Sequence, residues 1–406
     1  GARAVGAGPV SARVLPKGWR EVTLGSLGQI FDGPHATPTR GDEGAYFLNI
    51  ASLDAGRLDL SKSDRVSKED FATWTRRVQP MSGDLLFSYE TRLGAAALMP
   101  SGVQACLGRR MALLRPDRRV VDPTFLLYAY LSPYFQALIE ERTVHGATVD
   151  RIPLNAMSAW LMRLPDLSEQ RAIAEVLGAL DDKIAANARL VEASSAVALA
   201  LASQASTFVR VGEVAVHARS QVTPADMKAE VVHHYSLPAF DAASGPDIVA
   251  PGEIKSSKFL VIKPSVLVSK LNPRFPRIWD VSVLDEFDAL ASTEFVVLEP
   301  HSVSSSLLWA LIAQPAVSVE LEAQVAGTSG SHQRVKPEAI LAARIGNPST
   351  LSEEVRDGIE SCTSRAHAVR RETSKLIATR DALLPALMSG RLTVRDAEAV
   401  AAGAGL

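Results

Sequence analysis

Residues 164–205 read LPDLSEQRAIAEVLGALDDKIAANARLVEASSAVALALASQA, and this stretch decides the fold. Apolar residues recur in it at alternating steps of four and three, and no proline follows Pro165. This spacing predicts a long helix with one narrow apolar stripe, whose N-cap we assign to Ser168. Such a stripe needs a partner helix, because a lone helix leaves it in water. The stripe consists of Ile173, Leu177, Leu180, Ile184, Val191, Ala198 and Leu201.

The partner helix is expected near the C-terminus, where a second heptad pattern follows Ser352 and stops at Ser389-Gly390. The pair predicts an antiparallel coiled coil with a domain at each end and pseudo-twofold symmetry. With a rise of ~1.5 Å per residue, about 35 helical residues span about 50 Å. Asp181 and Asp182 are expected on the solvated side of the first helix. The second stripe consists of Val355, Ile359, Cys362, Ala366, Val369, Leu376, Leu383 and Leu387.

The rest of the chain predicts two mixed α/β domains that repeat one another. In each domain, short strands precede one predicted helix, at residues 123–141 and 305–324. Arg151-Ile152 recurs as Arg334-Val335, Pro165 recurs as Pro348 at the same offset, and other anchors fall close to it. This pattern predicts a duplication with a period near half the chain. The predicted fold class is therefore α+β, with domains at 1–163 and 207–350 and long helices at 164–206 and 351–406.

Composition bounds the class of protein. The chain has 406 residues, 47% hydrophobic and 22% charged, as in ordinary globular proteins. Its net charge of −2 argues weakly against a nucleic-acid binder, but such a total can conceal a basic face. Cys106 and Cys362 stand in no metal-ligand spacing, which predicts free thiols in the cytoplasm, no metal and no cofactor.

The sequence also predicts no membrane partner. No uninterrupted apolar run approaches the roughly 20 residues of a membrane span. Residues 1–19 lack the hydrophobic core of a signal peptide, and we expect them to form a flexible lead-in.

Four motifs carry a resemblance to a known family. LPDLSEQRAIA at Leu164–Ala174 opens the first long helix, and RDALLPALMSGRL at Arg380–Leu392 closes the second. GDLLFS at Gly83–Ser88 and VLVSKLNPRFPRIWDV at Val266–Val281 lie in the two domains. Together with the order domain, helix, domain, helix, these motifs resemble the specificity (S) subunit of type I restriction–modification systems over nearly the whole chain.

The resemblance implies a function and a set of partners. The S subunit of that family is not catalytic, and its two target-recognition domains each read one half of a split, asymmetric DNA sequence. The coiled coil separates the domains and helps to dock the methyltransferase. The implied partners are double-stranded DNA, two methyltransferase (M) subunits and restriction/translocase (R) subunits. The chain departs from the motif at Glu354, where the first long helix has Gln170.

Loop residues are the candidates for DNA contacts. Phosphates are held by Lys and Arg, and base edges are read by Arg, Asn, Gln, Ser or Thr. In the first domain we assign His35, Arg40, Arg76, Arg77, Tyr89, Arg92, Thr148 and Arg151, and in the second Lys258, Lys270, Asn272, Arg274, His332 and Arg334. A further basic cluster, half of which we expect to be a solvated edge, is Arg109, Arg110, Arg118 and Arg119. The residues expected to pair the helices and face partner helices are Ile173, Leu177, Leu180, Ile184, Val191, Val355, Ile359, Val369, Leu376 and Leu383.

Two other functions compete with a DNA reader. The first is a free-standing DNA methyltransferase, because NPRF at Asn272–Phe275 differs at one position from the NPP[FY] box that holds the adenine amino group. The arginine in that box and the absence of a glycine-rich loop upstream argue against catalysis. The second is a coiled-coil adaptor without DNA binding. His233-His234 would point to opposite faces of a strand, so we expect no shared metal there.

Overall fold

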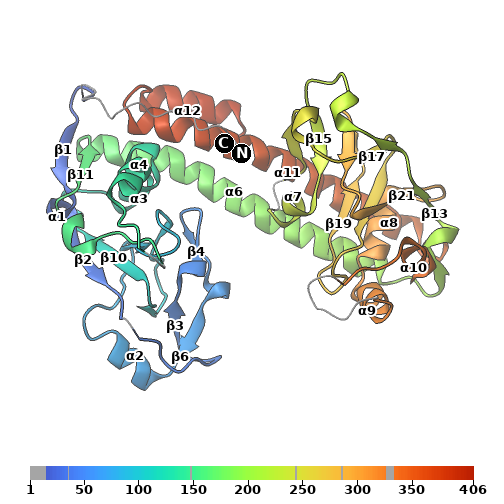
Figure 1. The fold of residues 1–406 in the computed structure, drawn as a ribbon, viewed down its shortest axis with the longest axis horizontal. Helices are drawn as coiled ribbons and strands as arrows, with labels where there is room; N and C mark the ends of the chain where they lie inside the picture. Colours follow the sequence, from blue (N-terminus) through green and yellow to red (C-terminus); the bar gives the residue numbers. More distant parts are fainter. Residues whose placement is uncertain (1–14, 35, 147–148, 243–244, 285–286, 326–332) are drawn as a thin grey trace. The chain divides into compact units, whose positions relative to one another are not determined.

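A computed structural model describes residues 15–34, 36–146, 149–242, 245–284, 287–325 and 333–406 (Figure 1). The chain divides into two compact units, residues 1–182 with 376–406 and residues 183–375. Each unit combines a mixed α/β domain with parts of two long helices, so the predicted fold class is confirmed. Residues 1–14 of the expected lead-in lie outside the described residues.

The first unit places its described strands in four small sheets, ordered β1-β11, β2-β10-β7-β8, β6-β3-β9 and β4-β5. The strands are β1 Arg20–Thr23, β2 Gly28–Asp32, β3 Ala45–Leu48, β4 Leu53–Asp54, β5 Arg57–Leu58, β6 Asp64–Val66, β7 Leu85–Ser88, β8 Ala96–Leu98, β9 Ala105–Leu107, β10 Met111–Pro116 and β11 Leu161–Leu164. The helices of its domain are α1 Leu24–Leu27, α2 Lys68–Trp74, α3 Pro123–Leu131, α4 Pro133–Arg142 and α5 Leu154–Met157.

The second unit places its described strands in sheets ordered β12-β22, β13-β21-β18-β19 and β14-β17-β20-β15-β16. The strands are β12 Phe208–Arg210, β13 Ala215–Ala218, β14 Gln221–Val222, β15 Val232–Tyr235, β16 Asp247–Val249, β17 Lys258–Val261, β18 Ser265–Ser269, β19 Ile278–Val281, β20 Ala289–Ala291, β21 Phe295–Pro300 and β22 Arg344–Gly346. The helices of its domain are α7 Leu237–Asp241, α8 Ser305–Ile312, α9 Pro315–Ala323 and α10 Pro337–Ala342.

The two domains share the central part of their topology. The sheet β2-β10-β7-β8 corresponds strand for strand to β13-β21-β18-β19, and the terminal pair β1-β11 corresponds to β12-β22. Each domain also has one parallel pair, β3 with β9 and β15 with β20. The duplication that the sequence offsets predict is therefore present in the fold.

A break after the first two turns divides each helix that the sequence analysis predicts as one. Residues 123–141 form α3 and α4, and residues 305–324 form α8 and α9. Ser132 (φ −63°, ψ 148°) and Gln314 (φ −65°, ψ 138°) are extended where the break occurs. Each precedes a proline, whose ring disfavours helical geometry in the residue before it. The prediction of one helix was wrong in both domains for the same reason.

The first long helix, α6, runs from Leu167 to Ala202, and its N-cap differs from the prediction. The Asp166 carboxylate accepts the backbone amides of Ser168 and Glu169, both at 2.9 Å. Asp166 therefore caps the helix two residues before Ser168, the predicted cap. The Ser168 hydroxyl also donates to this carboxylate (2.6 Å). This bond is the main cause that holds the pKa of Asp166 below its usual range, and the two amide bonds lower it further.

The second long helix, α11, runs from Glu353 to Met388 and ends at the predicted Ser389-Gly390 stop. Gly390 takes a positive φ of 64°, which suits a glycine after a helix. A short helix, α12 Val394–Gly403, follows. Of the predicted stripe residues, Ile184, Val191, Leu201, Val355 and Cys362 are half-buried. The remaining ones are buried, namely Ile173, Leu177, Leu180, Ala198, Ile359, Ala366, Val369, Leu376, Leu383 and Leu387.

In the first unit, Asp181 connects the long helices to the domain, which corrects the prediction that it is solvated. Its carboxylate accepts the Tyr128 hydroxyl of α3 (2.7 Å) and pairs with Arg380 of α11 (2.9 Å). The side chain of Asp181 is 14% exposed, whereas that of Asp182 is 85% exposed and pairs with Arg57 (3.1 Å). Tyr128 is buried.

In the second unit, the long helices run antiparallel and share the core of the domain. Asn187 donates to Glu372 (2.9 Å), and Leu201 lies against Gly358. Ala198 and Ala202 of α6 and Ile359 of α11 belong to the core cluster that also contains β18, β21 and α8. These parts of α6 and α11 therefore belong to the hydrophobic core of the second domain.

The hydropathy of α6 bears on the expected absence of a membrane span. An 18-residue window of this helix has a mean hydropathy of 1.3, so by length and composition alone it could cross a membrane. This value does not contradict the expectation, which concerned uninterrupted apolar runs, because the alanines of α6 raise the mean without forming a continuous run. In the second unit, however, Ala198 and Ala202 of the same helix are buried against the domain core, and the side chain of Asn187 bonds to α11. These contacts are typical of a helix that packs against other helices.

Candidate nucleic-acid interface

In the first unit, the loop after β7, the turn before β10 and the segment after α4 meet at one end of a sheet. The Tyr89 amide donates to the Arg110 carbonyl oxygen (3.1 Å), and the Tyr89 carbonyl oxygen accepts the Ile152 amide (2.8 Å). Glu90 and Arg151 form an isolated antiparallel bridge. These bonds bring Arg151, which is exposed, to the end of the sheet at which Arg92 lies.

The second unit repeats this arrangement bond for bond. The Lys270 amide donates to the Glu294 carbonyl oxygen (2.9 Å), and the Lys270 carbonyl oxygen accepts the Val335 amide (2.9 Å). Leu271 and Arg334 form the corresponding isolated bridge. The paired positions are related by nearly the same offset as the anchors of the sequence repeat. We call these two places the basic loop ends of the first and second unit.

Both loop ends contain a residue with a positive φ at the same position. Thr91 has φ 70° and Asn272 has φ 50°, and the two occupy matching positions of the repeat. Thr91 is the centre of a three-residue turn, in which the Arg92 amide donates to the Glu90 carbonyl oxygen (2.9 Å). Asparagine tolerates this conformation, but a β-branched threonine rarely adopts it. Strain of this kind is typical of functional loops.

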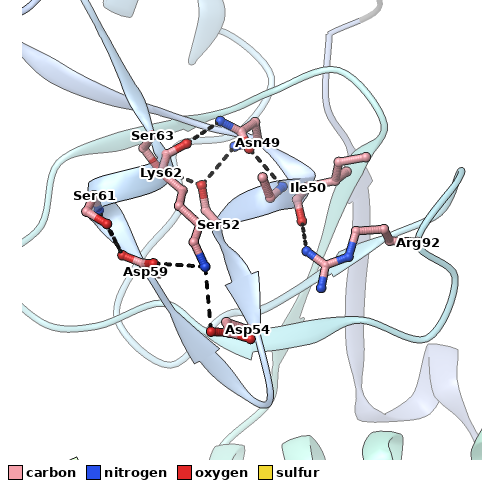
Figure 2. Close-up of polar contacts among 10 residues, drawn as sticks. Asn49, Ile50, Ser52, Asp54, Asp59, Ser61, Lys62, Ser63 and Arg92 are labelled. Carbon is pink, nitrogen blue, oxygen red and sulfur yellow. Dashed lines mark hydrogen bonds and ion pairs between the residues drawn. The ribbon is translucent and has the colours of Figure 1, made fainter. Parts of the chain in front are cut away.

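Arg92 is held by a polar network that Figure 2 shows. Its guanidinium donates to the Ile50 carbonyl oxygen (2.8 Å), in the short turn that Asn49 begins. The Asn49 side chain accepts the Ala51 amide (2.8 Å) and donates to the Lys62 carbonyl oxygen (2.7 Å). One exposed guanidinium is therefore anchored on a turn that is itself fixed by side-chain bonds.

The predicted arginine cluster of the first unit is divided by the structure. Arg109 and Arg110 precede β10, at the basic loop end, where Arg110 pairs with Glu90 (3.4 Å). Arg118 and Arg119 follow the other end of the same strand. Only the first pair can act together with Arg92 and Arg151.

The second loop end carries four of the residues assigned as candidate DNA contacts, Lys270, Asn272, Arg274 and Arg334. Arg334 pairs with Glu294 (2.8 Å). Arg274 is exposed, and Lys270 and Asn272 are half-buried. Within the described ranges, neither Lys270 nor Arg274 has a carboxylate within salt-bridge distance, so neither charge is balanced by an ion pair there.

His217 lies beside the second loop end, which the sequence analysis did not indicate. Burial lowers the pKa of its imidazole, and the positive charges of Arg219 and Lys270 lower it further. The ring is therefore uncharged at neutral pH. The sequence repeat could have indicated that Glu294 belongs to this loop end, because Glu294 corresponds to Arg110 at nearly the repeat offset.

A second basic place in the first unit surrounds a cavity of about 410 Å³. Trp74, Arg76 and Arg77 line it, together with Asp32 at the end of β2. Arg77 pairs with Asp32 (3.0 Å), and Arg76 is exposed. Arg40 pairs with the first residue of β6 (2.9 Å). In the described part of the chain, no hydrogen bond or ion pair joins these three arginines to Arg92 or Arg151 at the basic loop end.

Two predicted contact residues are wrong because their side chains are buried. Tyr89 is 6% exposed, and burial raises the pKa of its hydroxyl. Lys258 is also 6% exposed, and its amine donates to the carbonyl oxygen (2.9 Å) and hydroxyl (2.6 Å) of Ser256. Both sit in strand or strand-end positions that hold the fold. Three further candidates lie outside the described residues, namely His35, Thr148 and His332.

The described residues offer no clear metal or thiol chemistry. They contain no group of three His, Cys, Asp or Glu side chains that could hold a metal ion. Burial raises the pKa of the Cys106 thiol to about 12, so it stays protonated at neutral pH. His233 is buried and His234 is half-buried on adjacent positions of β15.

Comparison with known proteins identifies a sequence relative. No family model matches the chain. Over 183 residues it is 25% identical to the putative type I restriction enzyme MjaX specificity subunit of Methanocaldococcus jannaschii. The match covers 42% of this chain and 41% of that protein, so the alignment spans about two fifths of the relative's length.

One solved structure extends the likeness to the whole fold. The crystal structure of the type I restriction–modification S subunit from M. genitalium aligns with 91% of this chain and 96% of its own, at a TM-score of 0.56 and 15% identity. The chain has the fold of a type I specificity subunit. This fold and the sequence relative confirm the resemblance that the motifs indicate. The HsdS subunit from Thermoanaerobacter tengcongensis aligns with 93% of the chain and 97% of its own, at a TM-score of 0.37 and 17% identity.

Proposed function

We propose that the chain is the DNA sequence-recognition subunit of a type I restriction–modification complex. Each α/β domain reads one half of a bipartite, asymmetric DNA target through its basic loop end. The observation that supports this most directly is the recurrence of one loop geometry, with exposed cations, in both units. A total charge of −2 does not oppose this role, because the cations are gathered at these ends.

The cations divide into two classes by their surroundings. Lys270 and Arg274 have no ion-pair partner among the described residues and suit phosphate oxygens, which need charge but little geometry. Arg334 is oriented by Glu294 (2.8 Å), so its planar fork is held in one direction, as a base contact requires. Asn272 lies at the turn between them and can present an amide to a base edge.

The long helices set the spacing between the two half-sites and dock two M subunits in this proposal. Ile184, Val191 and Val355 support it, because these stripe residues are only half-buried in the chain by itself. Partner helices would cover the remaining apolar surface. The docked M subunits methylate adenine at the sequence that the S subunit selects, and R subunits join them for cleavage.

The NPRF segment serves DNA contact and not catalysis in this proposal. Asn272 occupies the backbone position that Thr91 occupies in the first unit, where no such box exists. Pro273 is buried, so the segment has one face against the domain. A positive φ at the same position of both repeats accounts for the asparagine without a methyl-transfer reaction.

The test uses the complex of this chain with its M subunits on duplex DNA that carries the target. Arg92→Ala with Arg151→Ala removes two cations from the first loop end, and Lys270→Ala with Arg274→Ala removes two from the second. Each pair should weaken binding and reduce the slope of log affinity against log salt by about 2.

Arg118→Ala with Arg119→Ala is the matched control, because these arginines follow the opposite end of β10. This variant should leave both affinity and slope unchanged. Equal slopes in all variants would contradict DNA reading by the loop ends. Methyl transfer by the purified chain without any M subunit would contradict the non-catalytic role.

A further inference from the structure

Phe275 is an exposed aromatic side chain in the loop between β18 and β19 of the second unit. It is 62% exposed, although phenylalanine normally lies in the core. The loop, residues 270–277, leads into β19 in Figure 1 and belongs to the second basic loop end. An apolar ring left in water at the site of a proposed DNA contact calls for an explanation.

The loop that carries Phe275 is firmly anchored. The Asn272 amide donates to the Gln333 carbonyl oxygen (3.0 Å), and the Phe275 amide donates back to the Asn272 carbonyl oxygen (2.9 Å), which closes a turn. Pro273, inside this turn, is buried and fixes the backbone. Arg277, at the other end, makes two bonds to Asp241, at 2.6 and 2.9 Å. The ring is therefore held out on a rigid support, so ordering it on binding costs little.

One cation lies over the ring, and the carboxylates of this region are paired with arginines. The Arg274 guanidinium lies over it, 5.7 Å from the ring centre. The nearby carboxylates of Asp241, Glu294 and Glu338 each pair with an arginine, at 2.6, 2.8 and 3.9 Å. Such surroundings attract a polyanion and do not suit an acidic or purely apolar partner.

The equivalent loop of the first unit carries no such ring. There the loop of residues 89–95 presents Arg92, which bonds to Ile50, and a half-buried Leu93. The two loop ends share a backbone plan, so the aromatic side chain is a specific addition in the second unit.

We propose that Phe275 inserts between adjacent base pairs of the half-site contacted by the second unit, unstacks them and bends the DNA there. The inference rests on the proposed function and adds a mechanism to one of its two loop ends. Apolar wedges such as phenylalanine act in this way on duplex DNA, and flanking cations hold the phosphates of the opened step. Base steps that unstack easily, such as TA or CA, are then favoured at this position.

The experiment measures insertion directly. The complex of the chain with its M subunits is bound to target duplexes in which 2-aminopurine replaces one adenine at a time. At one position of the second half-site, fluorescence should rise on binding, because the probe loses its stacking partner. Phe275→Ala should abolish the rise and weaken binding by about 5- to 100-fold, as for other stacking side chains. Phe275→Leu should retain part of both effects.

Two controls separate insertion from charge and from folding. Phe208→Ala removes another exposed phenylalanine of the second unit (58% exposed), which also has an arginine, Arg344, over its ring (5.3 Å). It should change neither affinity nor fluorescence. Arg274→Ala should lower the salt slope by about 1, whereas Phe275→Ala should leave it unchanged, because phenylalanine carries no charge.

The outcomes distinguish this inference from the function on which it rests. A wild-type complex without any sequence-specific binding would contradict the proposed function itself. Specific binding that Phe275→Ala leaves intact would overturn the insertion alone. Weaker DNA binding by Phe275→Ala, together with no fluorescence rise at any position in the wild-type complex, would also overturn the insertion. The ring would then be only a surface contact.

Discussion

Gln170 is fully buried where α6 begins, and its side chain bonds to three backbone groups. Its oxygen accepts the Asp122 amide (3.0 Å), and its nitrogen donates to the carbonyl oxygens of Pro165 (3.1 Å) and Val120 (3.3 Å). The LSEQR motif therefore needs glutamine in order to join α6 to the start of α3. Glu354, at the matching position in α11, is exposed and does not join two helices in this way.

Gln170→Ala should lower the free energy of unfolding by about 2 to 3 kcal/mol, because it leaves buried backbone groups without partners. Glu354→Ala should change it by less than about 0.5 kcal/mol, as for most exposed positions. Urea unfolding followed by circular dichroism measures both. Equal effects of the two substitutions would contradict the assigned role of Gln170.

His217 and His234 should make the second unit less stable in mild acid. Burial is the main cause that lowers the pKa of each, so each binds a proton less readily when folded than when unfolded. Well above pH 6.5 both are neutral in either state and contribute no difference. As the pH falls through 6.5, the unfolded chain takes up protons first, and the free energy of unfolding falls.

The variant His217→Gln with His234→Gln should therefore show a flatter dependence of stability between about pH 7.5 and about pH 5.5. Thermal unfolding at several pH values measures this slope. A slope identical to that of the unaltered chain would assign the pH dependence to other groups.

The long helices show how an element predicted from a stripe is completed by polar contacts. The spacing of apolar residues predicts both helices, and the buried residues Leu177, Leu180 and Leu376 confirm the stripe. The bonds of Asp181 to Tyr128 and Arg380 could not be predicted, because they depend on how α3 packs against the helices. From the sequence alone, a carboxylate beside the apolar stripe of a helix is predicted to be solvated, because the residues that pack against it are not known.

Asp181→Ala should lower the free energy of unfolding by about 2 kcal/mol, because it removes one partner of a mostly buried ion pair and the acceptor of a buried hydroxyl. Asp182→Ala is the control one residue away. Its side chain is 85% exposed, and its pair with Arg57 should be worth less than about 1 kcal/mol. Similar losses in the two variants, measured by thermal unfolding, would contradict the buried network.

The helix breaks and the loop ends differ in how far the sequence predicts them. Pro133 and Pro315 are visible in the sequence, and the break before each follows from the restriction on the preceding residue. Which residues lie at the loop ends depends on strand register. Candidate DNA contacts were therefore assigned from residue type alone. Tyr89 was assigned in this way, and its side chain is buried, as are those of the four β7 residues before it.

Across the whole chain, the duplication gives two loop ends of one geometry and different chemistry. Lys270 occupies the backbone position of Tyr89, and Glu294 occupies that of Arg110. One scaffold with two sets of side chains is expected to read two different half-sites. The sequence indicated this organisation through its offsets and motifs, whereas the bases read depend on loop side chains whose contacts no periodicity encodes.

The most direct test of the central claim is single-molecule methylome sequencing of a host with its methyltransferase subunit, with and without this chain. We predict a methylated motif of two different short halves around a fixed gap, which disappears when this chain is deleted. A methylome that is unchanged by the deletion would contradict the claim that this chain selects the DNA sequence.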